Sequence, residues 1–285
     1  MFFYKNLGVK YTVKREIDYV CLNNVFHSFR LYYIQIPCQT INFKLFMSNI
    51  FFRFKQFTVF HDSCAMKVGT DGVLLGAWTN VSKRTNILDV GTGTGLIALM
   101  LAQRNKDACI YAIDIDESCV LQAQRNIENS SFAQQIDVEK KSFQEYAATT
   151  NNRYDLIVSN PPYFQNSLKS PSNSRNHARH NDSLSFFEII SQGASLLNED
   201  GRIVLILPHE FKKQLLKHAG TVELFANRIT NVFPLPHKSA KRLLIELGLQ
   251  DNVCVEDNLT IELSRHHYTD EFKALTKTFY LNLQL

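Results

Sequence analysis

Short hydrophobic runs alternate with amphipathic stretches along the chain from about residue 47 onward. The runs are five or six residues long and typical of buried parallel strands: 86–90, 109–114, 154–158 and 202–207. The amphipathic stretches have the length and spacing of helices: 96–104, 117–129, 184–197 and 210–218. Strands and helices in alternation predict an α/β domain built on a mostly parallel sheet.

Three further strands complete the predicted sheet. Residues 136–141 form a more polar, exposed strand, and residues 230–235 and 242–250 form an antiparallel hairpin near the C-terminus. The predicted sheet therefore has seven strands. The segments around 261–263 and 272–283 are expected to close the fold.

Residues 1–46 differ from the rest of the chain. They are rich in Phe, Tyr and Asn, show no helical periodicity and contain no recognisable motif. Our hypothesis is that they are an extension, upstream sequence included by an early choice of start codon, and that Met47 opens a single domain at 47–285. The alternative is an ordered accessory hairpin.

Composition excludes several classes of protein. With 285 residues and 45% hydrophobic residues the chain can bury a sizeable core, but no stretch reaches the roughly 18 apolar residues of a membrane span. No signal peptide is evident. The net charge is +4, and residues 1–46 carry six Lys or Arg against two acids, so 25 of each remain in the domain. Global charge therefore gives no argument for a nucleic-acid partner.

The six cysteines are scattered and include no C-x-x-C pair. This pattern predicts neither a zinc site nor a disulfide framework, and it indicates a reducing cytoplasm. Cys109 and Cys119 are interpreted as ordinary thiols of the core or surface. No histidine between residues 164 and 183 has a partner at metal-ligand spacing, so we expect no metal.

The segment Ser159-Asn160-Pro161-Pro162-Tyr163 directly follows a buried strand. Prolines cannot donate to a ladder, so the strand ends in a stiff turn, at the sheet edge where open α/β folds bind ligands. The Asn160 side chain and the Pro161 carbonyl can accept the two N–H groups of an exocyclic amine, and Tyr163 offers a ring on which a base can stack. These residues, with Pro162, are the predicted catalytic turn. The alternative is a proline-rich turn without chemistry.

A glycine loop, Gly91-Thr92-Gly93-Thr94-Gly95, joins the strand 86–90 to a helix. Strand, glycine loop and helix form the turn of a nucleotide-binding half-sheet. Asp89 before the loop would repel a pyrophosphate and attract a cation such as an ammonium or a sulfonium. Asp114 ends the next strand about 20 residues later, where an acid can hold both ribose hydroxyls. Asp116 is interpreted as a helix cap.

Residues 66–78 contain a second candidate for cofactor binding. Thr70 or Asp71 can cap a helix that starts here, and the adjacent glycines leave backbone open to a ligand. Two clusters of basic residues are candidates for phosphate contacts, although a solvated loop is the alternative for the first. They are Lys169, Arg175 and Arg179 after the catalytic turn, and Lys238, Lys241 and Arg242 in the hairpin connector.

Together these motifs resemble the class I S-adenosyl-L-methionine-dependent methyltransferases, which have a Rossmann-like fold. The resemblance rests on three features: Asp-x-Gly-x-Gly-x-Gly at 89–95, Asp114, and Asn-Pro-Pro-Tyr at 160–163. Segments 54–59 and 67–78 further resemble the bacterial tRNA (adenine-N6)-methyltransferases that modify adenine 37, beside the anticodon of valine tRNA. The resemblance covers about residue 47 to the end. Ser142 stands where many relatives have an acid, so its contact is not assigned.

The resemblance implies several roles. Gly69, Thr70, Asp71, Asp89, Gly91, Gly93, Gly95 and Asp114 would bind S-adenosyl-L-methionine. The methyl group would pass directly to adenine N6 in the anticodon loop of a tRNA, in a cytoplasmic enzyme that acts as a monomer. Three alternatives remain: a protein glutamine-N5 methyltransferase, an N6-adenine or N2-guanine methyltransferase acting on another RNA or DNA, and a non-catalytic RNA-binding module.

Overall fold

A computed structural model gives the fold of the chain in two compact units, Met1–Ser48 and Asn49–Leu285. It describes residues 13–15, 21–22, 25–26, 32–34, 49–64, 67–162 and 184–282. In the first unit, β1 (Val13–Arg15) pairs antiparallel with β4 (Tyr32–Ile34), and β2 (Cys21–Leu22) pairs with β3 (Val25–Phe26). All motifs described above lie in the second unit.

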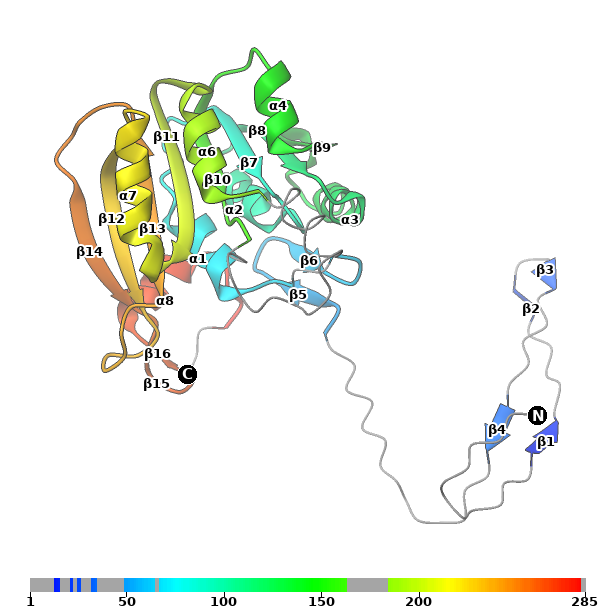
Figure 1. Ribbon diagram of the computed structural model, residues 1–285. Helices are drawn as coiled ribbons and strands as arrows, with labels where there is room; N and C mark the ends of the chain where they lie inside the picture. The colour runs from blue at the N-terminus through cyan, green and yellow to red at the C-terminus, as the bar shows by residue number, and fades with distance from the viewer. Residues whose placement is uncertain are drawn as a thin grey trace, which may run out of the picture. The chain divides into compact units, whose positions relative to one another are not determined.

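The second unit alternates strands and helices (Figure 1). Its strands are β5 (Phe51–Arg53), β6 (Thr58–Phe60), β7 (Asn86–Val90), β8 (Cys109–Asp114), β9 (Ile136–Lys140), β10 (Tyr154–Ser159), β11 (Leu197–Pro208), β12 (Phe225–Phe233), β13 (Arg242–Gly248), β14 (Val255–Thr260), β15 (Glu262–Ser264) and β16 (His267–Tyr268). The helices among its described residues are α1 (Thr70–Trp78), α2 (Leu96–Arg104), α3 (Glu117–Glu128), η1 (Ala133–Gln135), α4 (Phe143–Thr149), α6 (Phe186–Ala194), η2 (His209–Phe211), α7 (Lys212–Thr221) and α8 (Asp270–Thr276).

The main sheet has the strand order β14-β12-β13-β11-β10-β7-β8-β9 in the described residues. Of these eight described strands only β13 runs antiparallel to its neighbours, and it lies between β11 and β12. From β7 the chain builds outward through β8 and β9, then returns to place β10 on the other side of β7. The boundary between β7 and β10 is therefore a topological switch point, where open α/β sheets form their ligand crevice.

Helices cover both faces of this sheet, with α4, α6 and α7 on one face and α1, α2 and α3 on the other (Figure 1). Helix α2 is buried from Leu96 to Ala102, because it packs between α1 and the sheet. This explains why it is apolar on nearly every side rather than along one stripe. The two cores, one on each face, fix the strand ends that carry the motifs.

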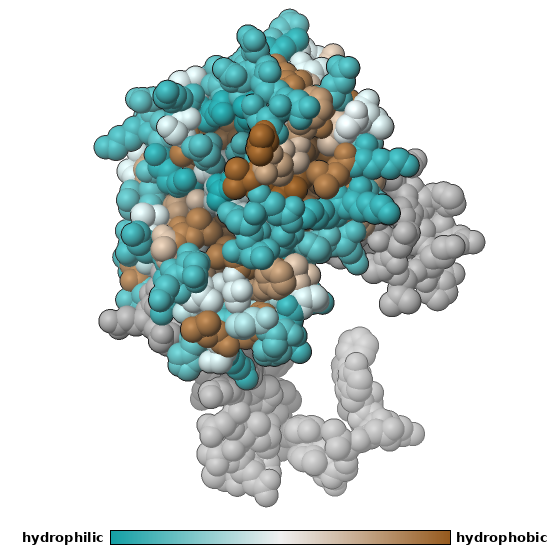
Figure 2. Space-filling model, turned by 90° about the vertical axis from the view of Figure 1, so that its left-hand side faces the viewer, coloured by the Kyte–Doolittle hydropathy of each residue, from teal (hydrophilic) through white to brown (hydrophobic). Residues whose placement is uncertain are grey.

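The α/β fold with its antiparallel hairpin is confirmed, but the predicted number of strands is wrong. An eighth strand, β14, pairs parallel with β12 at the edge of the sheet. Its first four residues are exposed, and Val255 is 60% exposed, so the segment lacks the hydrophobic run by which buried strands are recognised. Figure 2 shows this side of the molecule, where hydrophobic patches lie among hydrophilic surface.

One other prediction about the fold is also wrong. The cysteine pattern predicted no disulfide, yet Cys64 and Cys119 are bonded, with 4.8 Å between their Cα atoms. They are 55 residues apart in sequence, so only the packing of residues 60–64 against α3 brings them together.

Candidate active site

The glycine loop begins where β7 ends. The backbone N–H groups of Gly91 and Thr92 both donate to the carbonyl of Ile113, at 2.9 and 3.0 Å, which ties the loop to the end of β8. Gly91 and Gly93 have φ angles of +70° and +58°, a region that costs other residues about 1–2 kcal/mol. A Cβ atom at either position would meet no atom within 4 Å. The loop therefore presents bare backbone to open space.

Asp114 lies directly beside this loop. Its Oδ2 accepts a hydrogen bond from the Gly93 N–H at 2.8 Å, and its Oδ1 accepts one from the Asp116 N–H at 2.9 Å. Burial raises the pKa of Asp114, and these backbone donors oppose the shift. Each carboxylate oxygen keeps a second lone pair, so the group can still accept two hydroxyls. Asp116, as predicted, caps α3 through Ser118.

Asp89 does not lie in the wall of the site, where a residue that contacts the cofactor would be expected. It is fully buried beneath the loop and is not among the residues lining the two cavities described below. Its Oδ2 accepts a hydrogen bond from the Thr92 hydroxyl at 2.7 Å, whereas its Oδ1 accepts none of ordinary geometry from any described residue. Burial raises the pKa of Asp89 to about 7, although Thr92 and the backbone of Ala98 act in the opposite direction.

Because of this raised pKa, the free energy of unfolding of the ligand-free protein should depend on pH. The carboxyl group of Asp89 titrates near pH 4 in the unfolded chain and near 7 in the fold, so its contribution to stability is present below pH 4 and lost as the pH rises to 7. Asp89→Asn should therefore gain stability over the wild type across this range, by up to about 1.4 kcal/mol per pH unit. Urea unfolding between pH 4.5 and 8 measures the difference, with Asp137→Asn on the exposed strand β9 as the control. A difference that does not vary with pH would contradict the assignment.

The candidate catalytic turn begins where β10 ends. In the parallel register Ser159 lies opposite Val90, and its buried hydroxyl donates to the Val90 carbonyl at 2.7 Å. The last residue before the glycine loop is thus bonded directly to the last residue before Asn160. Pro161 is buried and Pro162 is exposed. Tyr163, the predicted stacking ring, lies outside the described residues.

Two cavities meet at these strand ends. The larger, of about 700 Å³, extends toward α1, and the smaller, of about 260 Å³, extends toward α3 and β9. Both are lined by the same five residues, namely Gly91, Gly93, Asn160, Pro161 and Pro162. The glycine loop and the Asn-Pro-Pro turn therefore form one site. The residues that precede them, Val90 and Ser159, are 69 positions apart in the sequence.

The start of α1 forms the far wall of the larger cavity, through Gly69, Thr70 and Asp71. The prediction that Thr70 or Asp71 caps this helix is wrong: Gly69 is the N-cap residue and provides no side-chain hydrogen bond. Asp71 instead pairs with Arg242 of β13, with 2.8 Å between Oδ2 and Nε. At its other end, α1 is held by a hydrogen bond of 2.8 Å from Trp78 to Thr230.

The basic residues divide into three groups. Arg242 lines the larger cavity, whereas Lys238 and Lys241 are exposed on the connector beside it. Lys169, Arg175 and Arg179 lie outside the described residues. Other residues that line the cavities were not predicted from the sequence: Lys67 in the larger one, and Lys141, Cys64 and Cys119 in the smaller. Lys67 lies within the predicted segment 66–78, but the remaining three come from packing that no local motif signals.

Comparisons with known proteins identify the family of the chain. Residues 66–230 match the model of the methyltransferase small domain family. The chain is 51% identical over 238 residues to a tRNA1(Val) (adenine(37)-N6)-methyltransferase of Parabacteroides distasonis, covering 83% of this chain and all of the relative. It is 46% identical over 239 residues to the protein of that name from Bacteroides thetaiotaomicron, covering 84% and 100%.

The chain belongs to the tRNA1(Val) (adenine(37)-N6)-methyltransferase family. The class I methyltransferase fold also appears in the crystal structure of a predicted O-methyltransferase from Agrobacterium tumefaciens. That structure has a TM-score of 0.57 at 17% identity, and the match covers 73% of this chain and 96% of the other. The predicted family, fold class and enzyme class are confirmed.

Methyltransferases of this class use S-adenosyl-L-methionine, as the sequence predicted, and the site fits it. The open space over Gly91 and Gly93 allows close approach to the backbone, and Asp114 provides acceptors for a ribose. Asp89 places a carboxyl group with an unsatisfied oxygen beneath the loop that would face a positively charged cofactor. When bound, this cofactor supplies an activated methyl group on a sulfonium. The individual roles of these residues stay predictions.

The glycine loop of this methyltransferase provides a direct test of the cofactor position. Gly93→Ala adds a methyl group where the ligand-free site is open and where φ is +58°, so it should destabilise the fold by about 1–2 kcal/mol. We expect cofactor affinity to fall at least tenfold as well, because the added carbon occupies the surface facing the cofactor. Calorimetric titration with S-adenosylhomocysteine, together with urea unfolding, measures both effects.

The matched control for this variant is Gly220→Ala in α7. A Cβ at Gly220 also meets nothing within 4 Å, but its φ is not positive and it lies outside the site. It should leave cofactor affinity unchanged. Unchanged affinity in Gly93→Ala itself would place the cofactor elsewhere.

Among the described residues, no group of three His, Cys, Asp or Glu side chains is arranged to hold a metal ion. The helices in the described part of the chain are too short or too polar to cross a membrane.

Proposed function

We propose that this chain transfers a methyl group from S-adenosyl-L-methionine to N6 of adenine 37 in the anticodon loop of a valine tRNA. The observation that carries the proposal is the shared site, in which the glycine loop and the Asn160 turn line the same two cavities at the switch point of the sheet. The curated relatives bearing this activity in their names, at up to 51% identity over most of the chain, support the choice of substrate.

In this proposal Asn160 and Pro161 orient the amine. The Asn160 side-chain carbonyl and the Pro161 backbone carbonyl each accept one N–H of the adenine amino group, so its nitrogen lone pair turns toward the methyl group. Pro162 stiffens the turn, and Tyr163 stacks on the base. Displacement is direct, without a covalent enzyme intermediate. The methylated amine is cationic and strongly acidic, so its extra proton passes to water.

We propose that the cofactor is bound between the glycine loop with Asp114 on one side and the start of α1 on the other. Gly91, Gly93 and Gly95 provide the backbone surface, with Asp89 supporting it from below. Asp114 holds the ribose hydroxyls in the smaller cavity, next to the Gly93 N–H that already orients its carboxylate. Gly69, Thr70 and Asp71 cover the opposite side of the larger cavity.

Basic residues at the rim would hold the tRNA backbone. We propose that Arg242, Lys238 and Lys241 contact phosphates from the hairpin side, and that Lys169, Arg175 and Arg179 do so from the segment after the catalytic turn. An anticodon-loop adenine is single-stranded, so moving it into the pocket costs less than opening a duplex. A cytoplasmic, monomeric enzyme is the form we propose.

The test is methyl transfer from labelled cofactor to bulk tRNA, followed by digestion to nucleosides. The expected product is N6-methyladenosine. A valine tRNA transcript should accept the label, and the matched transcript with guanine at position 37 should not. Label found in N2-methylguanosine, in DNA or in protein glutamine would contradict the proposal and would favour the corresponding alternative enzyme.

A further inference from the structure

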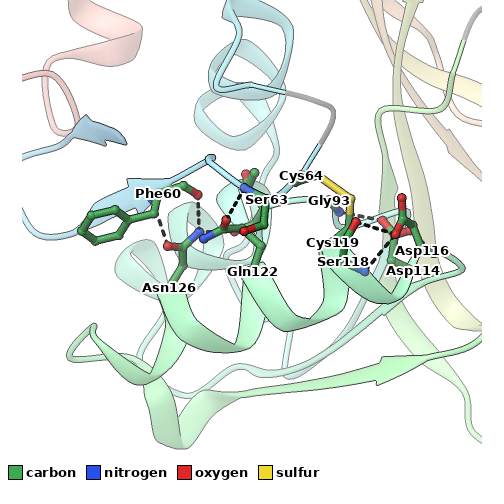
Figure 3. The surroundings of a disulfide bond; sticks show 11 residues. Phe60, Ser63, Cys64, Gly93, Asp114, Asp116, Ser118, Cys119, Gln122 and Asn126 are labelled. Atoms are coloured by element: carbon green, nitrogen blue, oxygen red, sulfur yellow. Dashed lines mark hydrogen bonds between the residues drawn. A yellow bond between two sulfur atoms is a disulfide. The ribbon is translucent and has the colours of Figure 1, made fainter. Parts of the chain in front are cut away.

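One face of α3 holds the segment that leads to the cofactor site (Figure 3). Cys119, Gln122 and Asn126 are spaced by three and four residues, so they share one side of the helix. All three are buried, with 7%, 2% and 0% exposure. Polar side chains are rarely buried without partners. Asn126 hydrogen-bonds to Phe60 and Gln122 to Ser63, and Cys119 is bonded to Cys64, whereas the Gln122 Nε2 has no partner among the described residues.

The contacts follow one another along the helix, from Asn126 through Gln122 to Cys119 (Figure 3). Asn126 accepts from the Phe60 N–H and donates to the Phe60 carbonyl, both at 2.9 Å, and it also donates to the Thr94 carbonyl of the glycine loop at 2.9 Å. Gln122 accepts from the Ser63 N–H at 3.0 Å. The Cys64–Cys119 disulfide is the last contact in the series and the nearest to the site.

The disulfide lies in the wall of the cofactor site itself. Cys64 and Cys119 line the smaller cavity together with Asp114 and Gly93, and Cys119 is in the first turn of α3, just after the Asp116 cap. Three residues after Cys64 the chain reaches Lys67, and then Gly69, which line the larger cavity. The covalent link therefore joins the segment entering one cavity to the helix bordering the other.

We propose that Cys64–Cys119 is a redox-sensitive tether for the cofactor site, closed in the oxidised form and released by a dithiol reductant. Disulfides in a cytoplasmic protein are usually transient or redox-sensing rather than structural. Reduction would leave the Asn126 and Gln122 hydrogen bonds in place, so residues 60–63 stay attached to α3. Only the wall next to Asp114 is freed. This inference rests on the cofactor assignment of the proposed function but not on the identity of the RNA.

The chemistry balances with a dithiol as the co-reactant. One thiolate of the dithiol attacks a sulfur of the Cys64–Cys119 bond and forms a mixed disulfide with the protein. The second thiol of the reductant then attacks this mixed disulfide and frees the protein cysteine. The protein gains two electrons and two protons as two thiols, and the reductant becomes a cyclic disulfide. Because both sulfurs border the smaller cavity, a bound cofactor and the reductant would compete for the same approach.

The oxidised form should bind the cofactor more tightly, by at least fivefold. Linkage then requires the reciprocal effect: a ligand that binds the oxidised form α-fold tighter makes the disulfide α-fold harder to reduce. A tenfold preference corresponds to about 30 mV in reduction potential. A disulfide with a purely structural role would show neither effect.

The experiment uses the full chain and S-adenosylhomocysteine as the probe. Calorimetric titrations compare the oxidised protein with the same protein in dithiothreitol, and thiol quantification in graded dithiothreitol buffers is done with and without the probe. Cys64→Ser and Cys119→Ser should each bind like the reduced wild type in both buffers. Cys109→Ser, which removes an exposed free thiol on β8, should keep the full redox response.

Equal affinity in the two redox states, or a reduction midpoint that the probe does not shift, would overturn the tether while leaving the proposed function intact. Two free thiols at Cys64 and Cys119 under oxidising conditions would overturn it as well. Binding absent from both forms would overturn the cofactor assignment and the tether together.

Discussion

Asn160→Ala should reduce methyl transfer by at least about 100-fold while leaving S-adenosylhomocysteine affinity within about twofold of the wild type. Asn160 lies at the meeting point of the two cavities, where its carbonyl is expected to favour the amine geometry that develops as the lone pair is donated. An acceptor of this kind acts mainly in the transition state, so its loss lowers kcat more than it raises KM. Single-turnover transfer to valine tRNA measures the effect.

A matched control for this variant lies at the other end of the same strand. Asn151 precedes β10, is exposed, and is remote from both cavities, so Asn151→Ala should retain full activity. If Asn160→Ala also retained full activity, the turn would not orient the amine. If it lost cofactor binding in proportion to activity, its role would be to shape the cofactor pocket.

Asp114→Asn should weaken cofactor binding by about 10- to 100-fold, because hydrogen bonds to a charged group contribute about 1.5–3 kcal/mol. Both carboxylate oxygens already accept backbone N–H groups, from Gly93 and Asp116. An amide in this place would turn its NH₂ group toward one of these donors, and would offer a ribose one acceptor oxygen instead of two. The loss should therefore affect the loop position as well as the ligand contact.

Calorimetry with S-adenosylhomocysteine gives the affinity, and thermal unfolding without ligand separates a binding effect from a folding effect. Asp137→Asn is the control, since Asp137 is exposed on β9 and lies outside both cavities. An affinity for Asp114→Asn equal to that of the wild type would assign the ribose to another residue.

Local patterns were sufficient to predict the elements whose residues interact with near neighbours. Helix α2 and strands β7 and β8 begin and end where the hydrophobic runs predicted them. The positions of Asn160 and Asp114 follow from the same logic, because a residue that ends a parallel strand must lie at the carboxyl edge of the sheet. The topology, with β10 beside β7, then brings their motifs together.

The features that were missed depend on contacts between distant segments. The disulfide requires Cys64 and Cys119 to meet across 55 residues, and Asp71 meets Arg242 across 171. The burial of Asp89 beneath the loop also depends on the packing of the sheet. Its place in the sequence, before the glycines, is compatible with a side chain that is buried and with one that faces the ligand. Strand β14 is recognised only through its ladder with β12.

In the proposed mechanism, a rigid turn holds the target amine beside a methyl donor bound by the glycine loop. A crystal structure of the enzyme with S-adenosylhomocysteine and an anticodon stem-loop of valine tRNA would show this arrangement. We predict adenine 37 N6 within about 3 Å of both Asn160 Oδ1 and the Pro161 carbonyl oxygen, facing the cofactor sulfur. An adenine 37 that stays stacked in the loop, or an Asn160 side chain turned away from N6, would contradict the account.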